Sequence, residues 1–431
     1  MNINEWIEYI NNGQLDGRMK ELYVESSSTM RMRARYVETL NKFGEYFGEK
    51  REDIFMFSAP GRTEVCGNHT DHQHGKVLAA SINLDAIAVT AVNNDNTVRI
   101  KSDDRVIEVI ELDEDFSDCL EMRECESGTS KGLIRGVLAG LHQRGYRIGG
   151  FDAYVTSDVL IGAGMSSSAA FEGLIGVIVS GLFNDMKIEA STMAMVSQYA
   201  ENVYFGKPCG LMDQMACCLG GMIYIDFEDT INPIVKKSEA DMDAMGLCVC
   251  IVDTKGSHAD LTNDYASIPA EMRAAALAYG KEYLRELDEE EFFRLLPEKK
   301  DMLTDRQVLR AMHFFDEEKR VEKAFLTLTK EDKAGFLEAI RSSGLSSIKY
   351  LQNIYSSAKP EEQAVGLALA ISERYLDGHG VCRVHGGGFA GTIQAFVEES
   401  FADSYKEAIE LFLGKDSCHI LKIRNAGAVM V

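Results

Sequence analysis

The sequence predicts an α+β protein built from two domains. The chain has 431 residues, which is more than one hydrophobic core usually serves, because most domains have roughly 100 to 200 residues. Helical stretches alternate with short β-prone runs in both halves, a pattern that favours a mixed architecture. A polar segment at 228–243 separates the two halves. We therefore expect one domain at 1–220 and a second at 221–431.

The first half supplies helices and strands in a regular order. Residues 1–50 set apolar positions among charges and are predicted to be largely helical. A strand-like run at 54–58 leads into a polar loop, and the apolar stretch 78–92 is expected to form buried strands. Alternating Val, Ile and charges at 97–112 predict a half-exposed strand pair. Residues 131–144 have the apolar spacing of an amphipathic helix.

The remaining elements follow from similar patterns. We expect a strand, a glycine loop and a helix at 151–183, and then a helix at 192–204. A strongly charged stretch at 269–357 is predicted to be helical, with its charges on solvated faces. The shorter elements are strands at 222–226 and 247–253, a strand-glycine-strand unit at 378–397 and a helix at 401–413.

Composition and charge exclude several kinds of partner. The formal net charge of −23 comes with no basic stripe that could neutralise phosphates, so no nucleic-acid partner is expected. The longest apolar run, at 173–183, falls short of the roughly 20 residues that cross a bilayer, so no membrane span is expected. The first residues lack a signal-peptide core, and the ten cysteines are scattered as in proteins with reduced thiols. These features predict a cytoplasmic protein.

The stretch from Val159 to Gly173 is the strongest candidate for a binding loop. It reads VLIGAGMSSSAAFEG, with a β-prone run before it and a long apolar segment after it. Glycines let the backbone approach an anion, and the N-terminus of the following helix adds free N–H groups and a positive dipole end. The stretch matches neither the P-loop nor the dinucleotide pattern. It is either a phosphate-binding loop or an ordinary turn with serine caps.

A polar loop at 61–75 holds several side chains that could bind a ligand. Its three histidines, His69, His72 and His74, lie close to Asp71 in the chain. Their spacing does not match the helical pairs of metal sites, although a metal stays an alternative. Neutral His, Asn and Asp side chains offer paired donors and acceptors, so a polyhydroxylated ligand fits the loop better.

Two carboxylates and a glycine-rich segment complete the candidate set. Glu201 lies twelve residues before Asp213, a separation that lets one carboxylate face a cation and the other a substrate hydroxyl. A helix-surface charge at Glu201 and a helix N-cap at Asp213 are the structural alternatives. The segment 385–391 contains three successive glycines, which implies that its backbone closely approaches a ligand or another loop.

Taken together, these stretches resemble the motifs of the GHMP superfamily of small-molecule kinases, and the first resembles the galactokinase signature. Galactokinases typically read Gly-Arg-Val-Asn-Leu-Ile-Gly-Glu-His-Thr-Asp-Tyr, where residues 61–72 of this chain read Gly-Arg-Thr-Glu-Val-Cys-Gly-Asn-His-Thr-Asp-His. The second motif, at 161–170, is close to the family form. The segment 209–214, Cys-Gly-Leu-Met-Asp-Gln, is nearly identical to the sequence around the galactokinase catalytic aspartate. The third motif, at 385–391, is looser, with His385 in place of the usual threonine.

The resemblance implies a two-domain GHMP kinase fold. An N-terminal ribosomal-protein-S5-like α/β domain and a C-terminal ferredoxin-like α/β domain would enclose the active site in a cleft between them. The implied reaction is transfer of the γ-phosphoryl group of ATP to the anomeric C1 hydroxyl of a monosaccharide, galactose or a close relative, giving a sugar 1-phosphate. The implied cofactors are ATP and Mg²⁺, the partners are small molecules, and a monomer or small homo-oligomer is expected.

The resemblance also implies roles for residues of this chain. Arg62 and Asp213 would be catalytic and flank the anomeric hydroxyl. Asp213 either takes its proton or only orients it, and Arg62 would stabilise the transferred phosphoryl group. Ser168 and Glu201 would bind Mg²⁺. The expected sugar contacts are Asn68, His69, Asp71, Gly210 and Tyr265. The expected ATP phosphate loop is Gly162, Ala163, Gly164, Met165, Ser166, Ser167 and Ser168.

Departures from the signature bear on the substrate. Asn68 stands where galactokinases have a glutamate that binds a sugar hydroxyl, thought to be the one on C6, and His72 replaces a tyrosine. An amide donates as well as accepts hydrogen bonds, so a sugar with a different C6 group, acidic or amino for instance, stays an alternative.

Two other functions stay open for the whole chain. One is a GHMP kinase for a non-sugar alcohol such as mevalonate or homoserine. The other is a non-catalytic regulator that binds sugar and ATP. The pair His69 and Asp71 after Arg62 argues against the first, and the complete serine loop together with Asp213 argues against the second.

Overall fold

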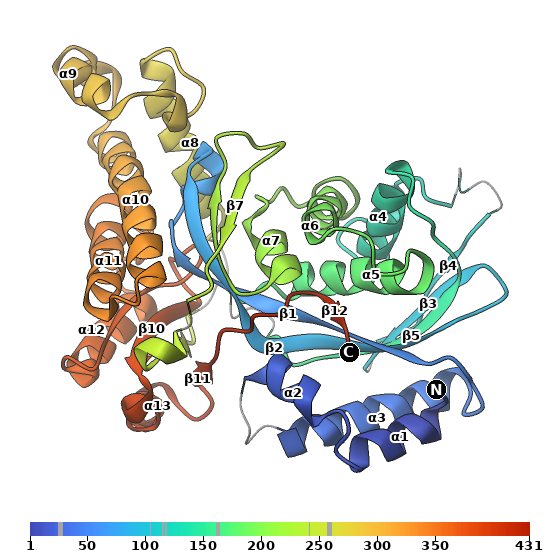
Figure 1. The fold of residues 1–431 in the computed structure, drawn as a ribbon. Helices are drawn as coiled ribbons and strands as arrows, with labels where there is room; N and C mark the ends of the chain where they lie inside the picture. Colours follow the sequence, from blue (N-terminus) through green and yellow to red (C-terminus); the bar gives the residue numbers. More distant parts are fainter. Residues whose placement is uncertain are drawn as a thin grey trace.

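Two β-sheets with helices packed on their faces make up the molecule (Figure 1). The computed structural model describes residues 1–24, 29–103, 105–113, 116, 119–160, 164–240, 242–256 and 261–431. Within these residues one sheet has eight strands and the other has four. None of the helices in this described part combines the length and the apolar character that a membrane span requires. The predicted mixture of helices and strands is confirmed.

The larger sheet is organised around one long strand, β2 (Lys76–Val92). β1 (Phe55–Cys66) pairs with β2 along most of its length, and β5 (Phe151–Ser157) and β6 (Met222–Asp226) pair with β2 at opposite ends of its other edge. β1 continues through Arg62, where the sequence predicts a loop, because its pairing with β2 persists past two register shifts. The other strands of this sheet are β3 (Thr97–Ser102), β4 (Glu108–Glu111), β7 (Ile234–Lys237) and β12 (Val429–Met430).

Strands from the second half of the chain complete the larger sheet. β6 and β7 follow residue 220, and β12 lies at the C-terminal end, yet all three pair within this sheet. The division expected at residue 220 therefore falls inside the sheet. The polar segment 228–243 contains β7, which is only four residues long and too short for its pattern to be detected in the sequence.

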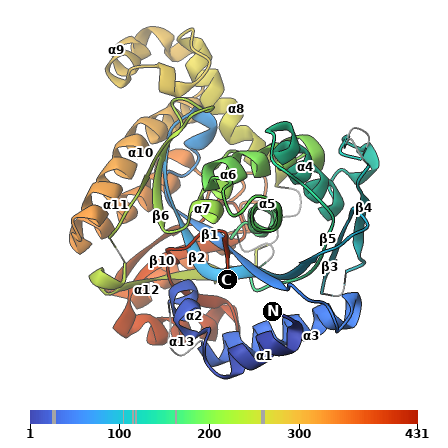
Figure 2. The same ribbon diagram turned by 45° about the vertical axis from the view of Figure 1, so that its right-hand side comes forward.

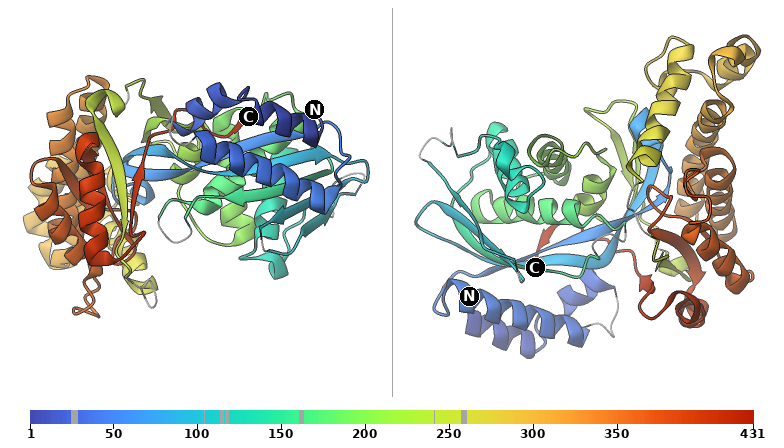
Figure 3. Two further views of the ribbon diagram at one scale, coloured as in Figure 1. Left: turned by 90° about the horizontal axis from the view of Figure 1, so that it is seen from below. Right: turned by 180° about the vertical axis from the view of Figure 1, so that it is seen from behind.

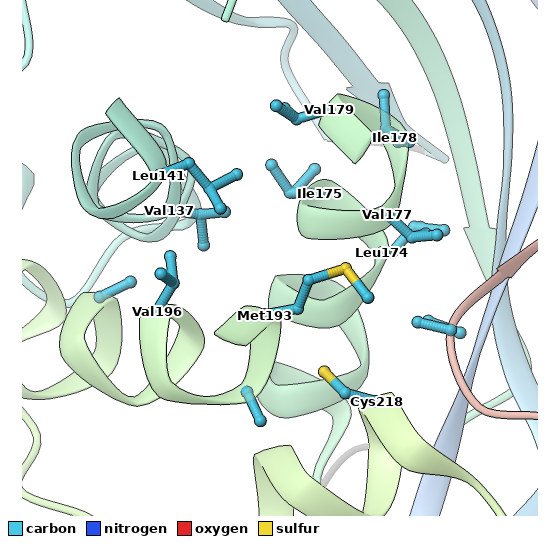
Figure 4. Close-up of a cluster of buried hydrophobic side chains, with 14 of the residues drawn as sticks. Val137, Leu141, Leu174, Ile175, Val177, Ile178, Val179, Met193, Val196 and Cys218 are labelled. Carbon is cyan, nitrogen blue, oxygen red and sulfur yellow. The ribbon is translucent and has the colours of Figure 1, made fainter. Parts of the chain in front are cut away.

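Two helical layers cover the larger sheet (Figure 1 and Figure 3). The N-terminal layer packs on one face through buried residues such as Tyr36 and Ile87. The second layer packs on the opposite face, and Figure 4 shows Val137, Ile175 and Val196 meeting in its core. The first layer consists of α1 (Ile3–Asn11), α2 (Asp16–Tyr23) and α3 (Thr29–Phe47), and the second of α4 (Ser130–Gln143), α5 (Ser167–Phe183), α6 (Ala190–Tyr199) and α7 (Met212–Leu219). This second core anchors the helix that follows the candidate phosphate loop.

The smaller sheet is antiparallel, with strand order β11-β8-β10-β9. Its strands are β8 (Leu247–Asp253), β9 (Gly380–Val384), β10 (Thr392–Glu398) and β11 (Cys418–Leu421). α12 (Ala364–Leu376) and α13 (Ala402–Leu413) pack on one face, and α10 (Asp305–Thr329) and α11 (Lys333–Ser346) pack on the other. α10 and α11, together with α8 (Thr262–Ala278) and α9 (Glu289–Lys299), form a helical arm beside the sheets (Figure 2).

A buried ionic network joins the N-terminal helices to the larger sheet. The Asp85 carboxylate of β2 accepts hydrogen bonds from Tyr23 of α2 (2.8 Å), from Ser58 of β1 and from Arg35 of α3 (2.5 Å). Arg424, near the end of the chain, donates to it at 3.1 Å. Burial raises the pKa of Asp85, but the two guanidinium groups outweigh burial and hold it below its usual value. The carboxylate is therefore ionised and fully partnered.

Asp85→Asn should destabilise the fold strongly, because it removes the carboxylate paired with buried Arg424 and leaves Arg35 with only its partly exposed partner Asp158. The expected cost is about 3 to 5 kcal/mol, which urea unfolding followed by circular dichroism would register as a lower midpoint. Glu45→Gln is the matched control, since its pair with Lys42 is exposed to solvent and its loss should leave the midpoint unchanged. An unchanged midpoint for Asp85→Asn would contradict the structural role of the network.

Candidate active site

The two candidate catalytic residues meet although they lie 151 positions apart in the chain. Arg62 comes from β1 and Asp213 from the first turn of α7. Arg62 Nε donates to Asp213 Oδ1 at 2.7 Å, and Nη2 donates to Oδ2 at 2.6 Å, which makes a bidentate contact. The Asp213 side chain is 30% exposed, against 10% for Arg62. Burial raises the pKa of Asp213, but Arg62 outweighs burial and holds it below its usual value. Asp213 is therefore an accessible, ionised acceptor.

The glycine and serine loop closes over this ion pair. Arg62 Nη1 donates to the carbonyl oxygen of Gly164, and the backbone N–H of Arg62 donates to that of Met165 at 3.1 Å. Ser166 Oγ donates to Asp213 Oδ2. Ser166 has a φ of +52°, a left-handed conformation that is uncommon for a residue with a side chain. The loop is therefore held by contacts to both candidate catalytic residues.

The same loop leads into the N-terminus of α5. Ser167 and Ser168 lie in its first turn, where backbone N–H groups have no partner within the helix. The positive end of the helix dipole therefore faces the loop, as an anion site requires. Gly162 and Ala163, which belong to the expected phosphate loop, lie outside the described residues.

Carboxylate and amide oxygens gather beside Ser168. Ser168 Oγ donates to Glu201 Oε1 at 3.2 Å, and Gln214 Nε2 donates to Glu201 Oε2 at 2.8 Å and to Glu172 Oε2 at 3.4 Å. Both carboxylates are buried, and Glu201 lies on the π-helical turn Ala200–Phe205. The buried Oε1 atoms of Glu172 and Gln214 have no hydrogen-bond partner in the part of the chain described. Burial and the charge of Glu201 raise the pKa of Glu172 well above its usual value. This excess of oxygen acceptors suits a cation.

The histidines of the polar loop do not form a metal centre by themselves. Across the described ranges, no group of three or more His, Cys, Asp or Glu side chains is arranged to hold a metal ion. Ser168 and Glu201 supply only two side-chain ligands. A magnesium ion at this place would therefore take most of its ligands from phosphate and water.

Asn68, an expected sugar contact, is buried and has no free hydrogen-bonding capacity. Its Nδ2 donates to the Gly386 carbonyl at 2.7 Å and to Glu64 Oε1 at 3.1 Å. Its Oδ1 accepts from Asn353 at 2.8 Å and from Ser347 at 3.4 Å. An amide has two N–H groups and two acceptor lone pairs, so all four are used. Asn68 thus ties the polar loop to the glycine-rich segment and offers no polar group to a ligand.

Glu64 is the carboxylate that accepts the hydrogen bond from Asn68. It is 5% exposed and accepts a hydrogen bond from Arg383 Nη2 at 2.9 Å. Burial raises the pKa of Glu64, and Arg383 limits the rise. The galactokinase signature has asparagine at the position of Glu64 and glutamate at the position of Asn68. This chain therefore keeps one carboxylate and one amide but exchanges their places, which puts the acid on β1 beside a buried arginine.

His69 and Asp71 lie on one short turn next to Gly210. His69 has a left-handed φ of +60°. Asp71 Oδ1 accepts the backbone N–H of His72 at 2.8 Å. A Cβ atom on Gly210 would collide with Asp71 Oδ2, which explains the glycine. Burial, with the charge of Glu64, raises the pKa of Asp71 to about 6. The structure therefore brings these three expected sugar contacts together.

The glycine-rich segment packs between Tyr265 and β1. The Tyr265 hydroxyl donates to the Gly388 carbonyl at 2.8 Å, and a Cβ atom on Gly387 would lie 2.6 Å from its ring. His385 contacts Thr63 Oγ1 at 3.0 Å, and burial lowers its pKa to about 3, so its ring is neutral. The close backbone approach expected from the three glycines is therefore made to other segments of the protein.

Three charged residues around the site could not be identified from the sequence. Glu64, Glu172 and Arg383 are buried charged residues on β1, α5 and β9. For Glu172 and Arg383, a charge within a largely apolar helix or strand is the signal that marks them, since such residues are seldom buried without a partner. The sequence does not show which partner each one has.

Comparison with protein families gives two matches. The galactokinase galactose-binding signature matches residues 41–92, and the N-terminal domain of GHMP kinases matches residues 132–221. The galactokinase of Clostridium tetani is 30% identical over 378 residues, which cover 86% of this chain and 91% of that protein. The galactokinase of Streptomyces coelicolor is 29% identical over 374 residues, covering 86% and 90% of the two chains.

Solved structures agree on the fold. Lactococcus lactis galactokinase complexed with galactose superposes with a TM-score of 0.76 at 22% identity, covering 92% of this chain and 100% of that one. Methanococcus jannaschii mevalonate kinase superposes with a TM-score of 0.60 at 14% identity, covering 86% and 99%. The predicted GHMP kinase fold is confirmed. With its two family matches and a relative at 30% identity over most of both chains, this chain belongs to the galactokinase family of the GHMP kinases.

Proposed function

We propose that this chain is an ATP-dependent sugar 1-kinase that phosphorylates the anomeric hydroxyl of galactose or a close relative. The bidentate contact between Arg62 and Asp213 carries the proposal, because it sets an ionised acceptor beside a cation where the polar loop and the serine loop meet. Phosphoryl transfer depends on positioning and charge stabilisation more than on covalent chemistry, and such a pair serves both. The relatives named galactokinase, which match most of the chain, support the same reaction.

The hydrogen bonds of Asp213 leave one defined place for the sugar hydroxyl. Among the described residues, Oδ2 accepts from both Arg62 and Ser166, whereas Oδ1 accepts from Arg62 alone. A carboxylate oxygen has two lone pairs, so one lone pair of Oδ1 stays available. We infer that the anomeric hydroxyl donates to Oδ1, where Asp213 orients it or takes its proton. Arg62 is placed to stabilise negative charge on the transferred phosphoryl group.

The serine loop and the oxygen cluster are proposed to hold ATP and Mg²⁺. Ser168 and Glu201 would bind the ion, and the unpartnered oxygens beside them favour a cation there. When bound, Mg²⁺ neutralises charge on the phosphates. The proposed phosphate loop consists of Gly162, Ala163, Gly164, Met165, Ser166, Ser167 and Ser168.

The sugar is proposed to lie between the polar loop and the glycine-rich segment. His69, Asp71 and Tyr265 would contact its hydroxyls, and the bare backbone of Gly210 lets Asp71 pack directly against it. We assign Asn68 a different role from a direct contact, because its amide is fully used by the protein. It would fix the shape of the loop that carries the contact residues.

Location and assembly follow only from the sequence. We infer a cytoplasmic protein from its composition and its scattered cysteines. A monomer or a small homo-oligomer stays the prediction for its assembly.

An ATP-consumption screen with Mg²⁺ tests the function directly. The panel holds hexoses, pentoses, amino sugars and uronic acids with a free anomeric hydroxyl, and mevalonate and homoserine serve as controls. We expect turnover with galactose or a close relative and none with the two controls. Faster turnover of a control would indicate a kinase for a non-sugar alcohol. Sugar binding without any turnover would indicate a regulator instead.

Asp213→Asn should abolish phosphoryl transfer and leave ATP binding largely intact, because it removes the ionised acceptor but no part of the phosphate loop. We expect kcat to fall by at least about a hundredfold, with the affinity for an ATP analogue, measured by calorimetry, within about twofold of wild type. Asp185→Asn, an exposed change just beyond the opposite end of α5 from the loop, is the control and should keep full activity. Retained turnover in Asp213→Asn would show that another group activates the hydroxyl.

The exchanged positions of Glu64 and Asn68 predict that Asn68→Glu alone destabilises the protein. The double substitution Glu64→Asn with Asn68→Glu should restore its stability. Asn68→Glu alone would set a second buried carboxylate about 3 Å from Glu64, so thermal stability should drop. Glu64→Asn combined with Asn68→Glu restores one acid and one amide, and should recover stability and shift kcat/KM toward galactose relative to other sugars. A double-mutant cycle on melting temperature and on sugar preference measures the coupling. Additive effects of the two changes would show that the positions do not interact.

A further inference from the structure

A lysine side chain reaches the oxygen cluster beside Ser168. Lys207 Nζ lies 3.4 Å from Glu201 Oε1, the same oxygen that accepts the hydrogen bond of Ser168 at 3.2 Å. The ammonium group is therefore no more than two hydrogen-bond lengths from the Ser168 hydroxyl in the first turn of α5. Within the described part of the chain, Lys207 makes the one ion pair that Glu201 has.

The backbone around Lys207 is held on both sides, whereas the side chain is not. Gly206, with a φ of +80°, reverses the chain, and the backbone N–H of Lys207 donates to the Glu201 carbonyl oxygen at 3.1 Å. Two residues later, the backbone N–H of Cys209 donates to Asn202 Oδ1 at 2.7 Å. The Lys207 side chain is 66% exposed, against 4% for Glu201. The lysine side chain can therefore move while its attachment point stays in place.

The contact between Lys207 and Glu201 leaves the ammonium group with spare capacity. A hydrogen bond from an ammonium to a carboxylate is usually about 2.7 to 2.9 Å long, and this one is 3.4 Å. An ammonium has three N–H groups. Among the described residues, Glu201 is the one hydrogen-bond acceptor that Lys207 Nζ contacts. Two of its N–H groups are therefore available to a ligand with oxygen acceptors.

The charge of Lys207 also acts on the candidate catalytic acid. Burial raises the pKa of Asp213, and Arg62 and Lys207 are among the groups that lower it. Asp213 and Glu201 each accept a hydrogen bond from a serine of the proposed phosphate loop. These two carboxylates would repel a triphosphate at that loop. A cation that acts on both of them is placed to offset the repulsion.

We propose that Lys207 is a further nucleotide-binding residue, whose ammonium group pairs with Glu201 in the free protein and transfers to a phosphate of ATP in the loaded protein. This inference rests on the proposed ATP site. Phosphate oxygens are strong acceptors, and lysine binds them as a flexible point charge. The transfer also frees Glu201 Oε1, the oxygen that faces Ser168. Lys207 therefore favours nucleotide binding and opposes metal binding to the free protein.

The test uses two probes that need no sugar. Calorimetry with ATP in the presence of EDTA measures nucleotide binding without a divalent ion. Mn²⁺, whose free form is followed by electron paramagnetic resonance, measures metal binding without a nucleotide, because it takes the same oxygen ligands as Mg²⁺. Both measurements are made at one fixed ionic strength, since salt screens exposed charges.

Lys207→Met should change the two affinities in opposite directions. The affinity for ATP should fall by about tenfold or more, because a charged hydrogen bond to a phosphate is lost. The affinity for Mn²⁺ should rise by about threefold or more, because Glu201 loses its competing cation. An unchanged affinity for either probe, or a weaker affinity for Mn²⁺, would overturn the proposal.

Two further variants separate the charge at this place from other effects. Lys187→Met removes the same charge from an exposed side chain beyond the opposite end of α5, and it should leave both affinities at their wild-type values. Lys207→Arg keeps the charge, so both affinities should stay within about threefold of wild type. Equal shifts in Lys187→Met, or a Lys207→Arg protein that behaves like Lys207→Met, would overturn the assignment to Lys207.

The outcomes also distinguish this inference from the proposed function. If the variants bind ATP and Mn²⁺ as expected but no sugar is turned over, the sugar-kinase function fails and the role of Lys207 is confirmed. If the wild type turns over a sugar and Lys207→Met binds ATP equally well, only the role of Lys207 fails. If the wild type binds no ATP, both fail.

Discussion

The ion pair between Arg62 and Asp213 is the contact on which the rest of the candidate active site depends. It joins the central strand pair of the larger sheet to α7 and, through the Gly164 carbonyl and the Ser166 hydroxyl, to the loop before α5. A guanidinium holds a carboxylate in one plane when both of its hydrogen bonds form. The same contact therefore orients the Asp213 carboxylate, keeps it ionised and shapes the loop that we propose binds the ATP phosphates.

A second set of buried polar contacts fixes how the two sheets meet behind this site. Thr63 of β1 contacts His385 at 3.0 Å and accepts from Gln394 of β10 at 2.5 Å. Arg383 of β9 donates to the Val65 carbonyl at 2.6 Å and to Glu64. Buried polar groups are costly unless they are paired, so these contacts define one arrangement of the sheets more strictly than apolar packing alone. The glycine-rich segment between β9 and β10 is placed by the same contacts.

Elements with a strong pattern could be predicted from the sequence, and weak ones could not. The strands at 222–226 and 247–253 have the bounds expected from their apolar runs, and the helix at 131–144 agrees within a residue. β7 could not be predicted, because four residues are too few to show a strand periodicity. The extension of β1 through Arg62 could not be predicted, because its polar side chains lack the pattern of a strand although its backbone pairs with β2. Pairing is a property of two segments, and one segment cannot reveal it.

The sequence by itself determined the family and the identity of most groups at the site, since the order and spacing of Arg62, the serine loop and Asp213 are readable in the chain. Only the tertiary structure decided what each group is free to do. Asn68 reads as a ligand contact in the sequence, yet four protein groups saturate its amide. His72 reads as a departure from the signature, yet its Nε2 atom is buried without a hydrogen-bond partner in the described part of the chain. The physical reason is that hydrogen-bonding capacity is limited, and residues distant in the chain use it up once folding brings them together.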